Sequence, residues 1–144
     1  MGNNGFEFHD NSVEVKKILQ ANINRGLGKA ALIVEAQAKA NVTAAGRVDS
    51  GQLRDRINHK VVGSGNETTA QIGSNEKHAI YNEFGTGEFA ENGAGRKGGW
   101  FFTSPDGSTH FTRGLKPAKF MRNAFRSKKK QTQQIISDEI GKGL

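Results

Sequence analysis

The sequence predicts an α+β fold, with an antiparallel sheet of about four strands in two hairpins and two long helices on one face. Apolar residues recur at three-and-four spacing near both ends of the chain, as in amphipathic helices. Between them lie short β-prone runs separated by glycine turns, and Pro-Asp-Gly at 105–107 is a strong turn signal. The order helix, hairpin, hairpin, helix allows both helices to cover the same face of one sheet.

A long first helix is predicted over about residues 12–43, where apolar side chains form one stripe. Gly26 and Gly28 weaken its middle, each by about 1 kcal/mol relative to alanine. Two interpretations of these glycines stay open: they permit a bend or close packing against another backbone, or they are simply tolerated. Residues 1–11 contain Gly and Asn without periodicity, so we expect a disordered arm.

The central segments predict the two hairpins. The runs 60–63 and 68–72 flank a glycine turn and form the first hairpin. The apolar spacing within residues 79–84 favours a short helix. The runs 99–103 and 109–112 bracket the Pro-Asp-Gly turn and form the second hairpin.

The 144-residue chain is expected to form a single domain, 1–144, folded over 12–140. Within it, residues 86–99 form a long flexible loop that is rich in glycine and is expected to be mobile. The aromatic run Trp100-Phe101-Phe102 is expected to anchor the return of this loop in the core. Pro117 is well placed in the first turn of the final helix, which extends to about residue 140.

Composition limits the classes of function. The chain has no cysteine, which excludes disulfides, thiolate chemistry and cysteine-based zinc sites. It contains no apolar run of membrane-spanning length, so a soluble protein without a membrane partner is expected. The formal net charge of +7 suits a polyanionic partner, either nucleic acid or an acidic protein ring.

The sequence nominates no catalytic, cofactor or metal site, and we expect that the protein is not an enzyme. None of its four histidines stands at metal-ligand spacing from another. His78 and Glu83 could form a general-base pair, but no nucleophile lies near them. Gly85-Thr86-Gly87 lacks the Lys-Ser/Thr ending of a phosphate-binding loop.

Charged residues give better candidates for binding. Arg96 and Lys97 precede Trp100 in the glycine-rich loop, a combination found in proteins that bind single-stranded nucleic acid. Glu83 lies in an otherwise apolar segment and needs a partner, an arginine or a backbone amide, which another subunit could supply. The final helix carries a basic cluster that is either a solvated face or a contact for DNA or an acidic partner: Arg122, Arg126, Lys128, Lys129 and Lys130.

Three segments resemble the HK97 gene-product-10-like family of tailed-bacteriophage proteins, small components of the head-to-tail connector and of tail completion. Residues 48–55 (Val-Asp-Ser-Gly-Gln-Leu-Arg-Asp) are similar to the signature that follows the first helix in that family. Residues 79–87 (Ala-Ile-Tyr-Asn-Glu-Phe-Gly-Thr-Gly) resemble its most distinctive block. Residues 114–124 match its glycine, proline, phenylalanine and alanine landmarks before the closing helix.

The resemblance implies a structural protein of the virion, assembled in the host cytoplasm, that forms a ring at the neck or tail top. The ring could be hexameric, the isolated chain could be monomeric, and the other partners would be connector or tail proteins and DNA in the channel. The alternative is a nucleic-acid-binding module that uses the loop around Arg96 and the run from Lys128 to Lys130. The candidate subunit interface comprises Glu83, Phe84, Gly85, Thr86, Gly87, Glu88, Phe89, Arg96 and Lys97.

Overall fold

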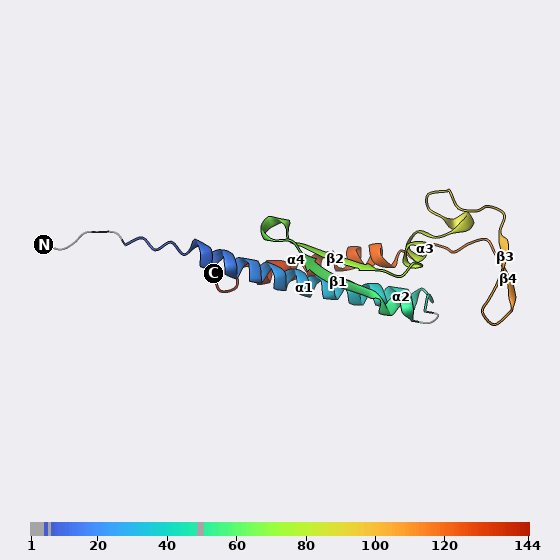
Figure 1. Ribbon diagram of the computed structural model, residues 1–144, viewed down its shortest axis with the longest axis horizontal. Coiled ribbons are helices and arrows are strands. Elements are labelled where there is room, and N and C mark those ends of the chain that lie inside the picture. Colours follow the sequence, from blue (N-terminus) through green and yellow to red (C-terminus); the bar gives the residue numbers. More distant parts are fainter. Residues whose placement is uncertain (1–4, 6, 49–50) are drawn as a thin grey trace.

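Two long helices lie antiparallel along the molecule, α1 (Ser12–Ala44) and α4 (Phe120–Ile140) (Figure 1). The computed structural model describes residues 5, 7–48 and 51–144. Hydrogen bonds at both ends of α4 fix the alignment of the two helices. Asn41 Nδ2 donates to Phe120 O at 2.9 Å, and Asn22 Nδ2 donates to Ile140 O at 2.9 Å. The predicted first helix is confirmed with nearly the same bounds.

Of the two glycines in α1, Gly26 is the one that packs against α4. A Cβ atom at Gly26 would be 3.2 Å from Glu139 Cβ and 3.4 Å from Ile136 Cα. A Cβ atom at Gly28 would meet nothing within 4 Å. Close packing against another backbone is therefore the correct interpretation of Gly26, whereas Gly28 is a tolerated glycine.

The first hairpin packs mainly against α1. The short helix α2 (Gln52–Asp55) leads into β1 (Ile57–Val62), which pairs antiparallel with β2 (Thr69–Ser74) through a 3-10 turn at Gly65–Glu67. The inward side chains of the hairpin join those of both helices in one apolar core. Its buried members are Val34, Ala38, Val42, Leu53, Ile57, Phe120 and Ala124.

The second hairpin lies beyond the ends of the helices (Figure 1). After α3 (Ala79–Phe84) and a 3-10 turn at Gly87–Phe89, β3 (Trp100–Thr103) pairs antiparallel with β4 (Thr109–Thr112). The α+β class and both hairpins are confirmed, but the strands form two separate two-stranded sheets rather than one sheet. The segments that lead to and from β3–β4 extend away from the helix pair, which separates the two sheets.

Two further expectations are wrong. Trp100-Phe101-Phe102 does not anchor the core: the side chains of Phe101 and Phe102 are 73% and 44% exposed, because β3 belongs to the outlying hairpin. Pro117 precedes α4 instead of lying in its first turn. The helix starts only at Phe120 because Lys119 adopts a left-handed conformation, with φ of 53°, that interrupts helical geometry.

None of the helices in residues 5, 7–48 and 51–144 is long and apolar enough to cross a membrane. Residues 7–11 enter α1 without regular secondary structure. The predicted mobility of residues 86–99 stays a prediction.

Candidate functional site

Two chain segments cross at the root of the outlying hairpin, one before β3 and one after β4. Thr86 N donates to Leu115 O at 2.9 Å, and Leu115 N donates to Thr86 Oγ1 at 2.9 Å. Two residues further along each segment, Glu88 N donates to Arg113 O at 2.9 Å. These bonds hold the two segments together outside any regular sheet, so the hairpin leaves the body from a fixed base.

Glycine makes this crossing sterically possible. Gly85 has φ of 80°, and a Cβ atom there would lie 2.7 Å from Phe89 O and 2.8 Å from Leu115 O. At Gly87, where φ is 60°, a Cβ atom would overlap the carbonyl oxygen of Arg113. Both positions combine a left-handed backbone with a close backbone neighbour, which only glycine tolerates. The predicted interface segment around Thr86 therefore packs tightly against its own chain.

Glu83, on α3, is buried with its carboxylate at the start of α4. It accepts hydrogen bonds from Met121 N at 2.9 Å and from Arg122 N at 3.1 Å, and Arg122 Nε donates to it at 2.8 Å. It thereby caps a helix whose own N-cap residue, Lys119, makes no side-chain cap. The expected partners, an arginine and backbone amides, are both present, and they come from the same chain.

Arg122 connects three parts of the site. Its Nη1 and Nη2 atoms donate to the two carboxylate oxygens of Glu91, each at 3.0 Å, while Nη2 also donates to Glu83 O at 2.8 Å. Its guanidinium lies 5.0 Å from the ring centre of Phe84. The hydrogen bonds from Arg122 hold the pKa of Glu91 below its ordinary value, and those to Glu91 and Glu83 raise the pKa of Arg122. Two carboxylates of the same chain thus already neutralise Arg122, which the sequence suggested as a contact for DNA or an acidic partner.

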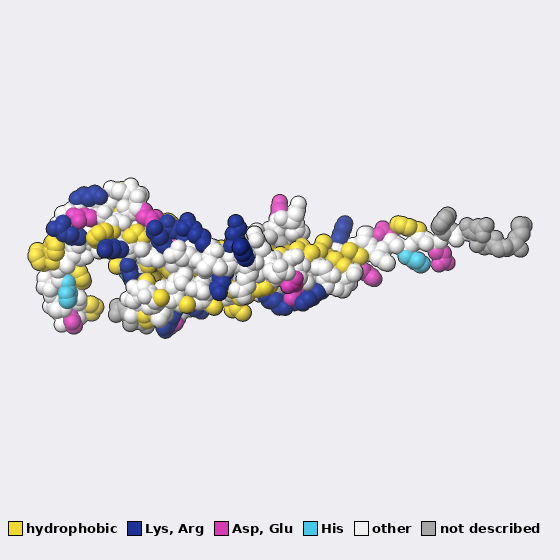
Figure 2. Space-filling model, turned by 180° about the vertical axis from the view of Figure 1, so that it is seen from behind, with side chains coloured by type: hydrophobic (Ala, Val, Ile, Leu, Met, Phe, Trp, Pro, Cys, Tyr) yellow, Lys and Arg dark blue, Asp and Glu magenta, His cyan; other side chains and the backbone are white. Residues whose placement is uncertain are grey.

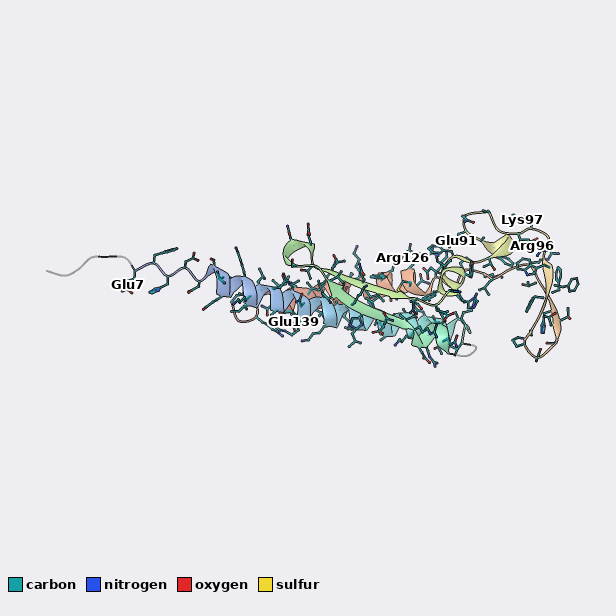
Figure 3. All side chains as sticks on the ribbon, in the orientation of Figure 1. Glu7, Glu91, Arg96, Lys97, Arg126 and Glu139 are labelled. Carbon is teal, nitrogen blue, oxygen red and sulfur yellow. The ribbon has the colours of Figure 1, made fainter. Side chains whose placement is uncertain are left out.

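The glycine-rich loop brings Arg96 and Lys97 to the outer end of the molecule (Figure 3). The Arg96 guanidinium lies 5.3 Å from the ring centre of Trp100. Gly98 N donates to a carboxylate oxygen of Glu88 at 3.0 Å, which ties the end of the loop back to its beginning. The structure thus brings Arg96 and Trp100 together, as the nucleic-acid hypothesis supposes, whereas Lys97 forms no ion pair with the described residues.

The hairpin exposes aromatic side chains on both of its faces. Phe101 and Phe111 lie directly opposite each other across the strands, with ring centres 5.1 Å apart, and are 73% and 51% exposed. On the other face, Phe102 stacks on His110 at 5.3 Å. Figure 2 shows hydrophobic side chains (yellow) at this end of the molecule, with a notch between the hairpin and the body. Large exposed apolar patches on soluble proteins are typical of interaction sites, which makes this end of the molecule a candidate contact surface.

The remaining basic residues of α4 stay free. Within the described part of the chain, Arg126, Lys128, Lys129 and Lys130 form no ion pair. Lys128 is half-buried and the other three are exposed. The sequence-predicted basic cluster is therefore split, since Arg122 is engaged with two carboxylates and the other four members form no ion pair among the described residues.

One buried ionic cluster was not predicted from the sequence. Glu139, on α4, is 3% exposed and accepts from Lys29, from Arg25 Nε at 2.8 Å and from Lys142 Nζ at 2.9 Å. Its hydrogen bonds to Lys29, Lys142 and Arg25 lower its pKa from 4.5 to about 2. Asn22 completes the cluster by donating to Lys142 O at 2.7 Å. The i,i+4 spacing of Arg25 and Lys29 was the only sequence signal that could have indicated it.

The four histidines lie on separate segments, with His9 before α1, His59 on β1, His78 before α3 and His110 on β4. His59 Nδ1 lies 2.8 Å from Glu35 Oε2, and His78 immediately precedes α3. The carboxylate of Glu83 is directed at α4, not at His78. In residues 5, 7–48 and 51–144, no three His, Cys, Asp or Glu side chains come together in a way that could hold a metal ion.

The fold and this site define an α+β protein with an elongated helix pair and an exposed aromatic hairpin at one end. Residues 6–85 match the family described as "Bacteriophage HK97-gp10, putative tail-component". This match covers more than half of the chain, and the protein belongs to that family, a group of structural phage proteins found in the virion. Searches of the curated proteins and of the solved structures found no match.

Proposed function

We propose that this protein is a ring subunit at the neck of a tailed phage, where it joins the head to the tail or completes the tail. The exposed aromatic hairpin supports this role most directly, because two of its phenylalanines are more than half exposed on a fixed base. A ring requires that one patch of each subunit contact a different patch on its neighbour. A hairpin held apart from the body supplies one such patch.

The loop and its base complete the proposed contact surface. Glu83 and the segment from Phe84 to Phe89 position it, while Arg96 and Lys97 carry positive charge at its outer end. Their partners would be a neighbouring subunit or an adjacent connector or tail protein with an acidic surface. Six copies around the tail axis and assembly in the host cytoplasm are part of this proposal.

The role can be tested by complementing a phage that lacks this gene. The double variant Phe101→Ser, Phe111→Ser removes the aromatic pair, and we expect complete heads and complete tails to accumulate separately in electron micrographs. Leu32→Ser is the matched control, because Leu32 is 56% exposed on α1, away from the hairpin. Wild-type yields of joined particles from the double variant would refute the proposal.

A second function, binding to DNA, is favoured by the free lysines from Lys128 to Lys130 on α4. Each phosphate contact contributes about 0.9 to the slope of log affinity against log salt on duplex DNA. Replacing all three lysines with glutamine should therefore weaken binding at low salt and flatten that slope. The measurement is a titration of labelled single- and double-stranded DNA at several salt concentrations. An unchanged slope would exclude these lysines as the contact.

A further inference from the structure

The first hairpin covers only part of the helix pair. Two packed helices have axes about 8–10 Å apart, whereas neighbouring strands are about 5 Å apart, so two strands are too narrow to cover both helices. The strands β1 and β2 lie mainly against α1. The described sheet contains no further strand beside β2, and one edge of β2 is therefore open. The first turns of α4 are left with an uncovered flank.

An apolar groove of about 540 Å³ follows this flank, between the end of β2, α3 and the start of α4. Ile80, Phe84 and Phe125 line it and are 63%, 47% and 46% exposed. Arg126 also lines the groove and has no ion-pair partner among the described residues. An open strand edge beside an apolar groove is the arrangement that accepts an added strand.

The hairpin β3–β4 has the complementary properties. It is a two-stranded ribbon with both outer edges open and aromatic side chains on both faces. Such a ribbon is only marginally stable in water without a further surface to cover one face. Asp106, in its turn, is the only acidic residue between Trp100 and Thr112, and its charge complements that of Arg126.

We propose that the β3–β4 hairpin of one copy docks along β2 and α4 of a second copy and extends its sheet from two strands to four. The inference rests on the proposed ring, for which it names the contact. The hydrogen bonds between Thr86 and Leu115 hold the hairpin away from the groove of its own chain. Each copy offers one hairpin and one groove, so the contact is heterologous and repeats from subunit to subunit.

Because the chain has no cysteine, introduced thiols can test the contact without background. Full-length Thr103→Cys or Thr109→Cys, marked with a tag, is mixed with untagged Gly73→Cys and treated with a short bis-maleimide. Gly73 lines the groove, and a Cβ atom there meets nothing within 4 Å. Gly28→Cys is the matched control, since its site on α1 is equally open but outside the groove.

We expect the tagged hairpin variants to link to Gly73→Cys at least several-fold more than to Gly28→Cys, and Phe111→Ser to abolish the difference. Equal yields would overturn the proposal. A full-length Thr103→Cys, Gly73→Cys double variant that links within one chain, while the separate chains do not link, would also overturn it, because the hairpin would then fold onto its own groove.

The phage complementation separates this inference from the proposed function. If the chains link but Phe111→Ser phages assemble normally, the docking contact is supported and the role at the neck is refuted. If no link forms but phages require the hairpin, the role at the neck is supported and the docking contact is refuted.

Discussion

Glu83 and Arg122 join α3 to the start of α4, with Arg122 Nε donating to Glu83 Oε1 at 2.8 Å. The same carboxylate accepts from two backbone amides at the N-terminus of α4, where the helix dipole favours negative charge. Arg122 then reaches on to Glu91 in the loop. The Glu83 carboxylate therefore adds a link between α3, α4 and the loop to the hydrogen bonds that fix the hairpin base.

The variant Glu83→Gln should lower the free energy of unfolding by about 2 kcal/mol, because it removes charge-assisted hydrogen bonds inside the protein. Urea titration followed by circular dichroism measures this change. Glu67→Gln is the control, since Glu67 is exposed, and it should change stability by less than about 0.5 kcal/mol. Equal stability of the two variants would contradict the capping role of Glu83.

The two glycines of α1 should respond in opposite directions to alanine. Gly28→Ala should stabilise the protein by up to about 1 kcal/mol, because alanine favours the helix and the new methyl group meets no neighbour. Gly26→Ala gains the same helix propensity, but its new Cβ atom would lie only 3.2 Å from Glu139 Cβ. Such overpacking costs about 1–3 kcal/mol, so this variant should be destabilised. Thermal unfolding of both variants provides the comparison. A Gly26→Ala protein as stable as Gly28→Ala would show that the helices separate without cost.

The buried cluster around Glu139 should make stability depend on pH. Since folding lowers the pKa of Glu139 from 4.5 to about 2, its contribution is fully present above about pH 4.5 and is lost as the pH falls toward 2. The urea midpoint of the wild type should therefore fall more steeply in this window than that of Glu139→Gln. Asp138→Asn, a change at the exposed neighbouring residue, should keep the wild-type slope. Parallel curves for wild type and Glu139→Gln would refute this assignment.

The crossing at the hairpin root should be sensitive to one added methyl group. Gly87→Ala places a Cβ atom against the carbonyl oxygen of Arg113, whereas Gly93→Ala, at a similar φ of 71°, meets nothing within 4 Å. Both changes incur left-handed strain of about 1–2 kcal/mol, but only Gly87→Ala should also separate the two segments. Hydrogen exchange of the amide of Glu88, which donates to Arg113 O, reports this directly. Equal protection in both variants would show that the contact is dispensable.

The sequence predicted the elements better than their assembly. The stripe of α1, both hairpins and the need of Glu83 for a partner are local or nearly local properties, so periodicity and turn chemistry were sufficient. The placement of β3–β4 was not predictable in this way. Trp100, Phe101 and Phe102 are typical core residues, and a sequence alone does not state whether such residues face their own core or another surface.

The sequence also did not predict the start of α4 or the Glu139 cluster, for a related reason. Pro117 satisfies the usual preference for a first-turn proline, but Lys119 takes a left-handed conformation that no local signal indicates. Glu139 meets Arg25 and Lys29 across more than one hundred residues of sequence, through the antiparallel alignment of α1 and α4. Contacts of this range follow from tertiary packing, which periodicity does not encode.

The length of α1 has a mechanical consequence. Its 33 residues span about 50 Å at 1.5 Å per residue, and α4 stiffens most of that length. The outlying hairpin lies near one end of this rod, and residues 7–11 lead into the other end (Figure 1). A tilt of about 10° at one end would displace the opposite end by roughly 9 Å, given a rise of about 1.5 Å per residue. In the proposed ring, a small rotation of a subunit at one end would therefore become a large shift at the other end.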